Sequence, residues 1–323
     1  MMNIPSTEAR VLDSFDDERD RFLPEGPRCL TVEGREALIW VNIQTAADAT
    51  GGTIHLRFWD NGERRDLPQA ARPGFVMPTD RPGFVVVGRE KEIGLLDLRS
   101  NEWTAWATIP DKNPRTIIND GEIVQGGKAI VFGTKDVRFA DPIAHLYLFT
   151  VDDRKITILA DKQTCSNGKI LMKSGFDRML FDIDTPKRTV VRYFVNLERR
   201  ILEDVRKCID LKSIEGFPDG MVNTGWDTFI IAFYNPSRGG TGRAIHFHLE
   251  SERIIEEWTT PGSPRVTCPL LFERDGKVQL VLTTAVEGMP AEMRAQSPNA
   301  GNLFIADVTL EERLPRAEVV RIG

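Results

Sequence analysis

The sequence lacks the features that mark several common classes of protein. Its first 22 residues contain no apolar core flanked by basic residues, so we expect no secretory signal, and no later run is long enough to cross a bilayer. The formal net charge is -6, and no dense stripe of Lys or Arg gives the electrostatic footprint of a nucleic-acid-binding protein. We therefore expect a cytoplasmic protein with no nucleic-acid or membrane partner.

The four cysteines are too widely scattered to form a disulfide framework, and none belongs to a CxxC pair. We interpret them as reduced, buried thiols of a cytoplasmic protein. They are Cys29, Cys165, Cys208 and Cys268.

Convincing amphipathic helices are also missing. The best candidate, residues 202–211, is equally compatible with a strand followed by a loop. Short strand-like runs separated by turn residues instead recur along the whole chain. With 323 residues, 41% of them hydrophobic, the chain suits either two domains or one large all-β unit.

The strand-like runs fall into six groups of four. Four-stranded units that repeat every ~40–50 residues are typical of a β-propeller. Because six groups leave nothing for a second domain, we predict one all-β domain over residues 1–323, a six-bladed β-propeller with four-stranded blades. The terminal segments 8–15 and 317–322 have no blade of their own, and we expect them to share the last blade and close the ring. A single large β-sandwich is the alternative.

Three similar turn motifs open successive groups of strands. Each motif contains an Asn or Asp next to a Gly. The motifs lie around Asn119, Asn167 and Asp219, which are 48 and 52 residues apart. Glu25 precedes Asn119 by 94 residues, which is about two of the same steps. Since the first strand of every propeller blade lines the central channel, we expect these four side chains to meet at one point on the axis.

The four side chains offer two carboxylates and two amide oxygens, with no sulfur or imidazole. Such hard oxygen ligands suit Ca²⁺, Mg²⁺ or Mn²⁺ better than a soft metal. Asn-Gly and Asp-Gly are also the commonest turn dipeptides, so each motif alone is explained as a turn. Three motifs at blade spacing, with a fourth acid in register, favour a site.

Other candidate sites are weaker. His246 and His248 share one face of a strand, but no third ligand pattern follows, so packing explains them better than zinc does. The Gly-rich segment 237–243 lies between two strands and precedes no helix, which favours a hairpin loop over a phosphate loop. The segment 121–129 fails the Walker pattern, because Ala129 stands where Ser or Thr must follow the Lys.

Seven motifs, in order along nearly the whole chain, resemble the gluconolactonase family, also called the senescence marker protein or regucalcin family. The resemblance implies a six-bladed propeller with one divalent metal in the central channel. We expect Ca²⁺ first, with Zn²⁺, Mg²⁺ and Mn²⁺ as alternatives. The motifs are PEGP at 24–27, LIWVNI at 38–43, NDG at 119–121, FGT at 132–134, SNG at 166–168, PDGM at 218–221, and LVLTTA with SPNAGNLF at 280–285 and 297–304.

The resemblance also implies roles for the axial residues. Glu25, Asn167 and Asp219 match the family's metal ligands, Asp219 also matches its proposed general base, and Asn119 matches a residue that contacts substrate. The implied activity is hydrolysis of a small-molecule sugar lactone. The metal would polarise the ester carbonyl, and Asp219 would take a proton from the attacking water or direct that water.

The chain departs from the family where the substrate is held. Ile117 replaces an Arg that commonly grips substrate hydroxyls, and Arg115 lies on the same strand face, where it would compensate in part. The segment after the FGT motif, a candidate lid, offers Asp136, Arg138 and Asp141 as substrate contacts. Two other functions remain open: a phosphotriester or phosphofluoridate hydrolase, and a non-catalytic calcium-binding regulatory propeller.

Overall fold

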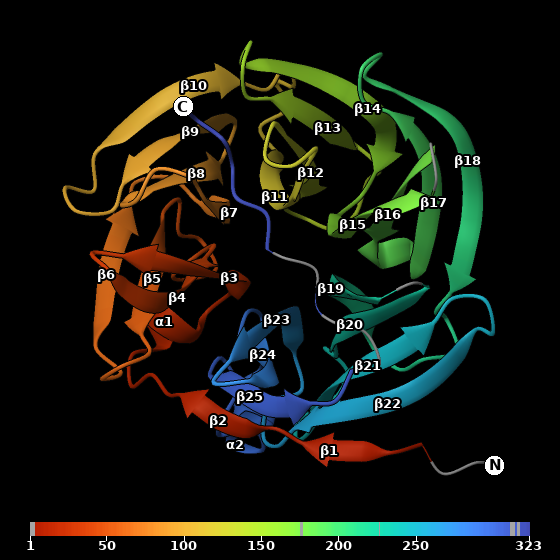
Figure 1. Ribbon diagram of the computed structural model, residues 1–323. Helices are drawn as coiled ribbons and strands as arrows, with labels where there is room; N and C mark the ends of the chain where they lie inside the picture. The colour runs from red at the N-terminus through yellow and green to blue at the C-terminus, as the bar shows by residue number, and fades with distance from the viewer. Residues whose placement is uncertain (1–3, 175–176, 226, 311–313, 315–316) are drawn as a thin grey trace.

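Six β-sheets surround a central axis in the computed structural model, which describes residues 4–174, 177–225, 227–310, 314 and 317–323 (Figure 1). The predicted six-bladed β-propeller with four-stranded blades is confirmed. The side chain of Cys208 lies outside the described part, so its predicted state stays a prediction.

The four main strands of each blade pair antiparallel, and the first strand of each blade lies nearest the axis (Figure 1). The first three blades contain β3 (Pro24–Val32), β4 (Arg35–Asn42), β5 (Gly52–Phe58) and β6 (Arg64–Gln69); β7 (Pro73–Pro78), β8 (Phe84–Arg89), β9 (Glu92–Asp97) and β10 (Trp103–Thr108); and β11 (Thr116–Val124), β12 (Ala129–Asp136), β13 (Ala144–Thr150) and β14 (Lys155–Gln163).

The fourth and fifth blades are formed by β15 (Ser166–Ser174), β16 (Asp177–Asp184), β17 (Thr189–Asn196) and β18 (Ile201–Asp210), and by β19 (Phe217–Gly225), β20 (Thr228–Tyr234), β21 (Gly242–His248), β22 (Arg253–Thr260) and the short β1 (Ser6–Glu8). The sixth contains β23 (Val266–Arg274), β24 (Lys277–Thr284), β25 (Leu303–Val308) and β2 (Arg10–Asp13). The segment that was compatible with a helix or a strand is therefore the strand β18.

Helices contribute little to the fold. The two α-helices in the described part are α1 (Glu18–Arg21) and α2 (Ala291–Ala295), and a 3-10 turn covers Thr185–Lys187. No helix in this part of the chain has the length and apolar character needed to span a membrane.

Apolar side chains pack on the faces of each sheet and so fill the spaces between neighbouring blades. Phe181 of β16 meets Phe229 of β20 edge-on, with ring centroids 4.9 Å apart. The rings of Phe75 in β7 and Phe132 in β12 are tilted relative to each other, with centroids 6.0 Å apart. Both faces of a blade are therefore covered, which explains why its inner strands read as nearly continuous apolar runs.

The N-terminal segment links the fifth and sixth blades. Strand β2 pairs with β25 and completes the sixth blade, while β1 runs parallel to β22 of the fifth. Because the first and last parts of the chain share a sheet, the ring closes by backbone hydrogen bonds, which leaves no open seam between its ends.

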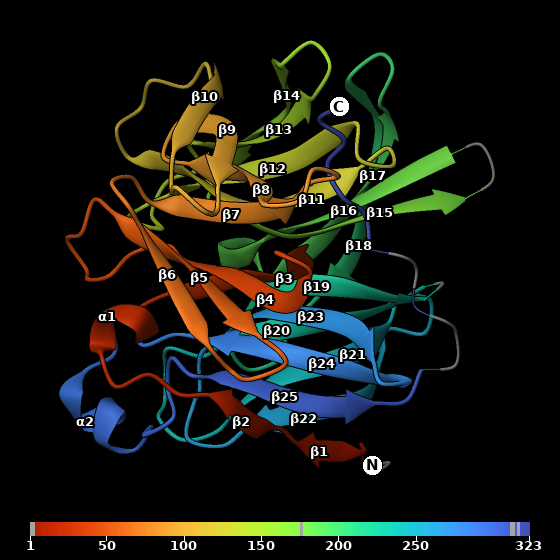
Figure 2. The same ribbon diagram turned by 60° about the vertical axis from the view of Figure 1, so that its left-hand side comes forward.

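The C-terminal segment does not join the sixth blade as we expected. Residues 317–323 instead dock on the second and third blades (Figures 1 and 2). The backbone of Val320 donates to the Pro78 carbonyl and accepts from the Asp80 N–H, each at 2.9 Å, and Arg321 donates to the Gly127 carbonyl at 2.8 Å. Strand β2 already occupies the free edge of β25, and the side chain of Val320 finds full burial in the core cluster around Phe75.

We predict that the docking of this segment stabilises the ring. Val320→Ala removes two fully buried methyl groups, which should lower the free energy of unfolding by about 2 kcal/mol and the midpoint by about 3 °C. Thermal unfolding followed by circular dichroism measures the change. Val319→Ala is the matched control, because Val319 is 37% exposed, and equal effects of the two substitutions would contradict the docked position.

Candidate metal and substrate site

Every inner strand carries a β-bulge or irregularity close to its first residues. The register shifts lie between Glu25 and Arg28, Pro73 and Phe75, Ile118 and Gly121, Asn167 and Lys169, Pro218 and Met221, and Val266 and Pro269. A bulge adds a residue to one strand and re-aims the neighbouring side chains. The four residues predicted to meet on the axis all lie within or beside such a bulge.

Glycine allows the blades to approach each other at these bulges. Gly168 has φ +34, and a Cβ built on it would lie 2.7 Å from the carbonyl oxygen of Asp219 in the next blade. A larger residue there would separate the two strands. The Asn-Gly motif thus has a packing role in addition to its turn.

The four predicted residues line one cavity of about 460 Å³ at this end of the channel. Three of them are almost fully buried: Asn119 is 4% exposed, Asn167 6% and Asp219 7%. The remaining lining residues are Leu23, Lys135, Val137, Phe139, Cys165, Thr185, Pro186, Phe217, Tyr234, Pro236, Arg265, Glu287 and Gly288.

Hydrogen bonds fix the two amides. Asn119 Nδ2 donates to Asn167 Oδ1 at 2.7 Å and to the Ser166 carbonyl at 3.1 Å. Asn167 Nδ2 donates to Thr185 Oγ1 at 2.9 Å, and this hydroxyl donates in turn to the carbonyl of Pro218. The two amides therefore form a connected unit that reaches from the third blade to the turn before Asp219.

The two axial carboxyl groups, Glu25 and Asp219, both have raised pKa values. Burial, followed by the charges of Asp219 and Asp120, raises the pKa of Glu25 well above its usual range. Burial also raises the pKa of Asp219 well above its usual range; the Lys135 charge opposes this shift, and Asp120 adds to it. Two acids from different blades thus oppose each other's ionisation in one desolvated space.

This arrangement fits a divalent cation. A dication would relieve the repulsion between Glu25 and Asp219, and Asn167 offers an amide oxygen beside them. Within the described ranges, no group of three or more His, Cys, Asp or Glu residues could hold a metal ion. The expected axial ligand set differs from such a group, because it combines two carboxylates with one amide oxygen.

Arg115, Asp136 and Arg138, which we expected to contact substrate, are not among the residues that line the cavity. Arg115 forms ion pairs with Asp136 and Asp141, the latter at 2.7 Å. The fully buried Asp136 carboxylate also accepts hydrogen bonds from the backbone N–H groups of Arg138, Ala140 and Asp141, at 3.0 to 3.1 Å. Arg115 and Asp136 are therefore committed to the loop after β12, and Arg138 is exposed on it.

Two cationic residues of the cavity were not predicted from the sequence. Lys135 is the penultimate residue of β12, directly after the FGT motif, and Arg265 immediately precedes β23. Arg265 Nη1 donates to Tyr234 Oη at 3.1 Å and to the Glu287 carbonyl. A charged residue at the end of an otherwise apolar strand was the available signal for Lys135.

The other sequence motifs have structural explanations. His246 Nε2 lies 2.9 Å from Thr224 Oγ1, and His248 Nδ1 accepts from the Ser251 N–H at 3.3 Å. The Gly-rich segment 237–243 connects β20 to β21, as expected for a hairpin loop.

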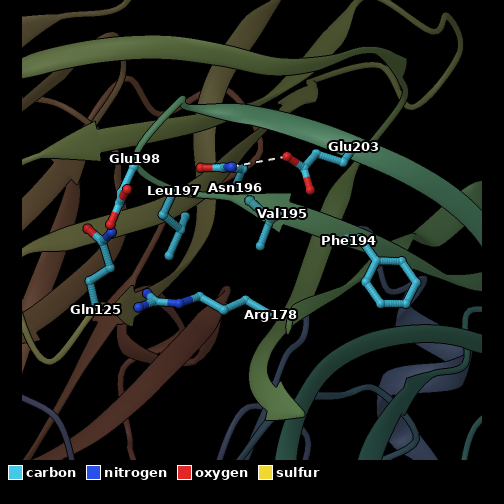
Figure 3. A pocket seen from close by; sticks show the side chains of 8 residues that line it. All are labelled: Gln125, Arg178, Phe194, Val195, Asn196, Leu197, Glu198 and Glu203. Atoms are coloured by element: carbon cyan, nitrogen blue, oxygen red, sulfur yellow. Dashed lines mark hydrogen bonds between the residues drawn. The ribbon is translucent and has the colours of Figure 1, made fainter. Parts of the chain in front are cut away.

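A second hollow of about 340 Å³ is lined by residues of the fourth blade and by Gln125, between β11 and β12 of the third (Figure 3). Asn196 donates to Glu203 there at 3.0 Å, and the side chain of Arg178 points toward Gln125 (Figure 3). None of the predicted site residues lines it.

We predict that Asp219→Asn weakens binding of a divalent cation at least about 10-fold, because it removes one of two carboxylates from the axial set. Calorimetric titration of chelator-stripped protein with Ca²⁺ measures the affinity. Asp141→Asn is the matched control, since it removes a carboxylate outside the cavity and should leave the affinity unchanged. Equal affinities in wild type and Asp219→Asn would contradict an axial cation site.

Asp136 should make stability depend on acid pH. Burial alone would raise the pKa of Asp136, but Arg115 and three backbone N–H donors outweigh it and hold the pKa well below its usual range. A depressed pKa stabilises the folded state above the ordinary pKa of about 4, and this stability is lost as the pH falls further.

The neutral substitution Asp136→Asn should therefore lower the unfolding midpoint at pH 7 and flatten its decline between pH 4 and pH 2. Differential scanning calorimetry across that range measures both effects. A decline as steep in the variant as in the wild type would contradict this role for Asp136.

Comparison with known proteins places this chain in a family. Residues 23–286 match the model of the SMP-30/Gluconolactonase/LRE-like region. The chain is 24% identical to L-arabinolactonase of Azospirillum brasilense over 84% of each chain, and 25% identical to regucalcin of Danio rerio over 72% of this chain and 75% of that protein.

Among solved structures, the calcium-binding protein regucalcin of Agrobacterium tumefaciens superposes with a TM-score of 0.81 at 18% identity. The superposition covers 99% of this chain and 100% of that one, so the two share a fold. The family match, which spans most of the chain from β3 to β24, shows that this protein belongs to the SMP-30/gluconolactonase/LRE-like family.

Proposed function

We propose that this protein is a lactone hydrolase with one divalent cation, Ca²⁺ first, held by Glu25, Asn167 and Asp219. The observation that carries the proposal is the pair of opposed carboxylates in the axial cavity. The L-arabinolactonase among the relatives supports a lactone as the substrate.

The axial residues would divide the work between binding and proton transfer. A bound divalent cation supplies Lewis-acid polarisation of the ester carbonyl. Asn119 holds Asn167 through its side-chain amide and so fixes the orientation of a metal ligand. The resemblance to the family implies that Asn119 also contacts the substrate. Asn119 lines the cavity, so such a contact is possible.

Asp219 would handle the proton of the attacking water. The water oxygen forms a bond to the carbonyl carbon while one of its protons passes to the Asp219 carboxylate. The bond between the carbonyl carbon and the ring oxygen then breaks, and the proton passes from Asp219 to the ring oxygen. The product is the open hydroxy acid, and Asp219 is regenerated as a carboxylate.

The walls of the cavity support this chemistry. Five of the lining residues have largely apolar side chains, which limit the contact of the polar groups with water. They are Leu23, Val137, Phe139, Phe217 and Tyr234. In such a space, charges on the protein interact more strongly with a developing oxyanion than they would in bulk solvent.

We predict that chelator-stripped protein is inactive and that Ca²⁺, Mg²⁺, Mn²⁺ or Zn²⁺ restores hydrolysis of a lactone. A pH-drop assay over sugar and aliphatic lactones measures the activity. Asp219→Asn should lower kcat/KM at least about 100-fold, and Asn119→Ala about 10-fold, with the fold retained by circular dichroism.

Asp141→Asn serves as the control for a lost surface carboxylate and should retain wild-type activity. Absence of turnover with every metal and lactone would overturn the lactonase proposal. Tight Ca²⁺ binding under those conditions would instead indicate a calcium-binding role, and turnover of a phosphotriester alone would indicate the other hydrolase class.

A further inference from the structure

Lys135 is the unexplained charge in the axial cavity. It belongs to β12, it is only 4% exposed, and it lines the cavity that holds the axial acids. In the part of the chain that the structure describes, its ammonium group has no hydrogen bond and no ion pair. A nearby ring belongs to Phe139, whose centroid lies 5.7 Å from Lys135 Nζ.

Burial of an ammonium group is costly unless an opposite charge accompanies it. Lys135 acts electrostatically on Glu25 and Asp219, and both of these acids line the cavity together with it. In the proposed enzyme, a divalent cation neutralises both of them. Lys135 is then left without a counter-charge in a space with largely apolar walls.

The other charged groups of the cavity do not compensate Lys135. Arg265 is itself cationic, and it is occupied by Tyr234 and the Glu287 backbone. The Glu287 carboxylate acts on Arg265 and on Asp219. With the cation in place, the formal charges of Lys135 and Arg265 outnumber that of Glu287 among the residues that line the cavity. Asp120 is outside this lining and lies 3.9 Å from the ammonium group of Lys169.

We propose that Lys135 determines specificity by pairing with a carboxylate on the substrate, so that the natural substrate is a lactone that carries a second, free carboxylate. This inference rests on the proposed function, because it assumes that a cation occupies Glu25 and Asp219. It explains why a chain in which Ile117 replaces the usual substrate Arg still places a positive charge in its cavity.

A carboxylate fits Lys135 better than a phosphate does. A lysine ammonium is a single compact charge, whereas phosphate sites commonly combine several donors or the fork of an arginine. The guanidinium of Arg265 is directed to Tyr234 and Glu287 rather than left free for a phosphate.

Two lactones that differ only at carbon 6 test the proposal. D-glucaro-1,4-lactone carries a carboxylate there, and D-glucono-1,4-lactone carries a hydroxymethyl group. We expect the wild type to show a kcat/KM at least about 10-fold higher for the glucaro compound, as expected for one charged hydrogen bond. Lys135→Met should remove about 10- to 100-fold from the glucaro value and less than about 3-fold from the glucono value.

Two further variants separate charge from packing. Lys135→Arg keeps the positive charge and should retain most of the preference. Lys187→Met removes an exposed lysine next to Pro186 at the cavity, where Lys187 pairs with Asp184, and should leave the preference intact. Equal losses for both lactones in Lys135→Met, or no loss for either, would overturn the specificity role.

Binding of the open-chain acids gives a readout that does not require turnover. Calorimetry at constant free Ca²⁺ should show tighter binding of D-glucarate than of D-gluconate to the wild type, and no difference in Lys135→Met. Tighter binding of 6-phospho-D-gluconate than of D-glucarate would overturn the assignment to a carboxylate.

The two experiments separate the failure of this inference from failure of the proposed function. If the wild-type protein hydrolyses neither lactone but binds D-glucarate through Lys135, the anion site stands and the lactonase proposal is wrong. If the wild-type protein hydrolyses D-glucono-1,4-lactone as well as or better than D-glucaro-1,4-lactone, the lactonase proposal stands and the role of Lys135 is wrong.

Discussion

Repulsion between Glu25 and Asp219 is the constraint on which the axial site depends. The propeller brings these acids together from different blades and buries them beside Asp120, so the pKa values of both lie well above the usual range. A fold that kept this arrangement without a compensating cation would lose stability. The connected amides of Asn119 and Asn167 add polar groups at the same end of the channel. A cation site is the chemical use that best fits this concentration of oxygen ligands.

The rest of the molecule holds these side chains in place. Bulges near the start of the inner strands turn the axial residues toward the channel, and glycines such as Gly168 let adjacent blades approach. Ring closure by β2 and the hydrogen bond of Val320 to Pro78 join parts of the chain that are distant in sequence. The positions of the axial groups therefore depend on the whole ring, and no single blade could hold them alone.

The strand period and the spacing of the Asn-Gly and Asp-Gly motifs were enough to predict the blades and the common cavity of the axial residues. That information lies in the local turn residues and in the recurrence of groups of four strands along the chain. The surroundings were harder to predict. Arg115 and Asp136 read as substrate contacts, yet they organise a loop, because their pairing depends on the path of the chain after β12. The burial of Lys135 depends on neighbouring blades, and the docking of Val320 on a core shared by β7 and β11, which no local pattern encodes.

One measurement tests the central claim most directly. Crystals of the protein soaked in Mn²⁺ would be measured near the manganese absorption edge, where anomalous differences locate the ion. The account predicts a single strong peak between the carboxylates of Glu25 and Asp219, beside Asn167, with Lys135 Nζ directed away from it. The absence of a peak there, with Lys135 in direct ion pairs with both carboxylates, would contradict the account. Lys135, and not a metal ion, would then neutralise the axial carboxylates.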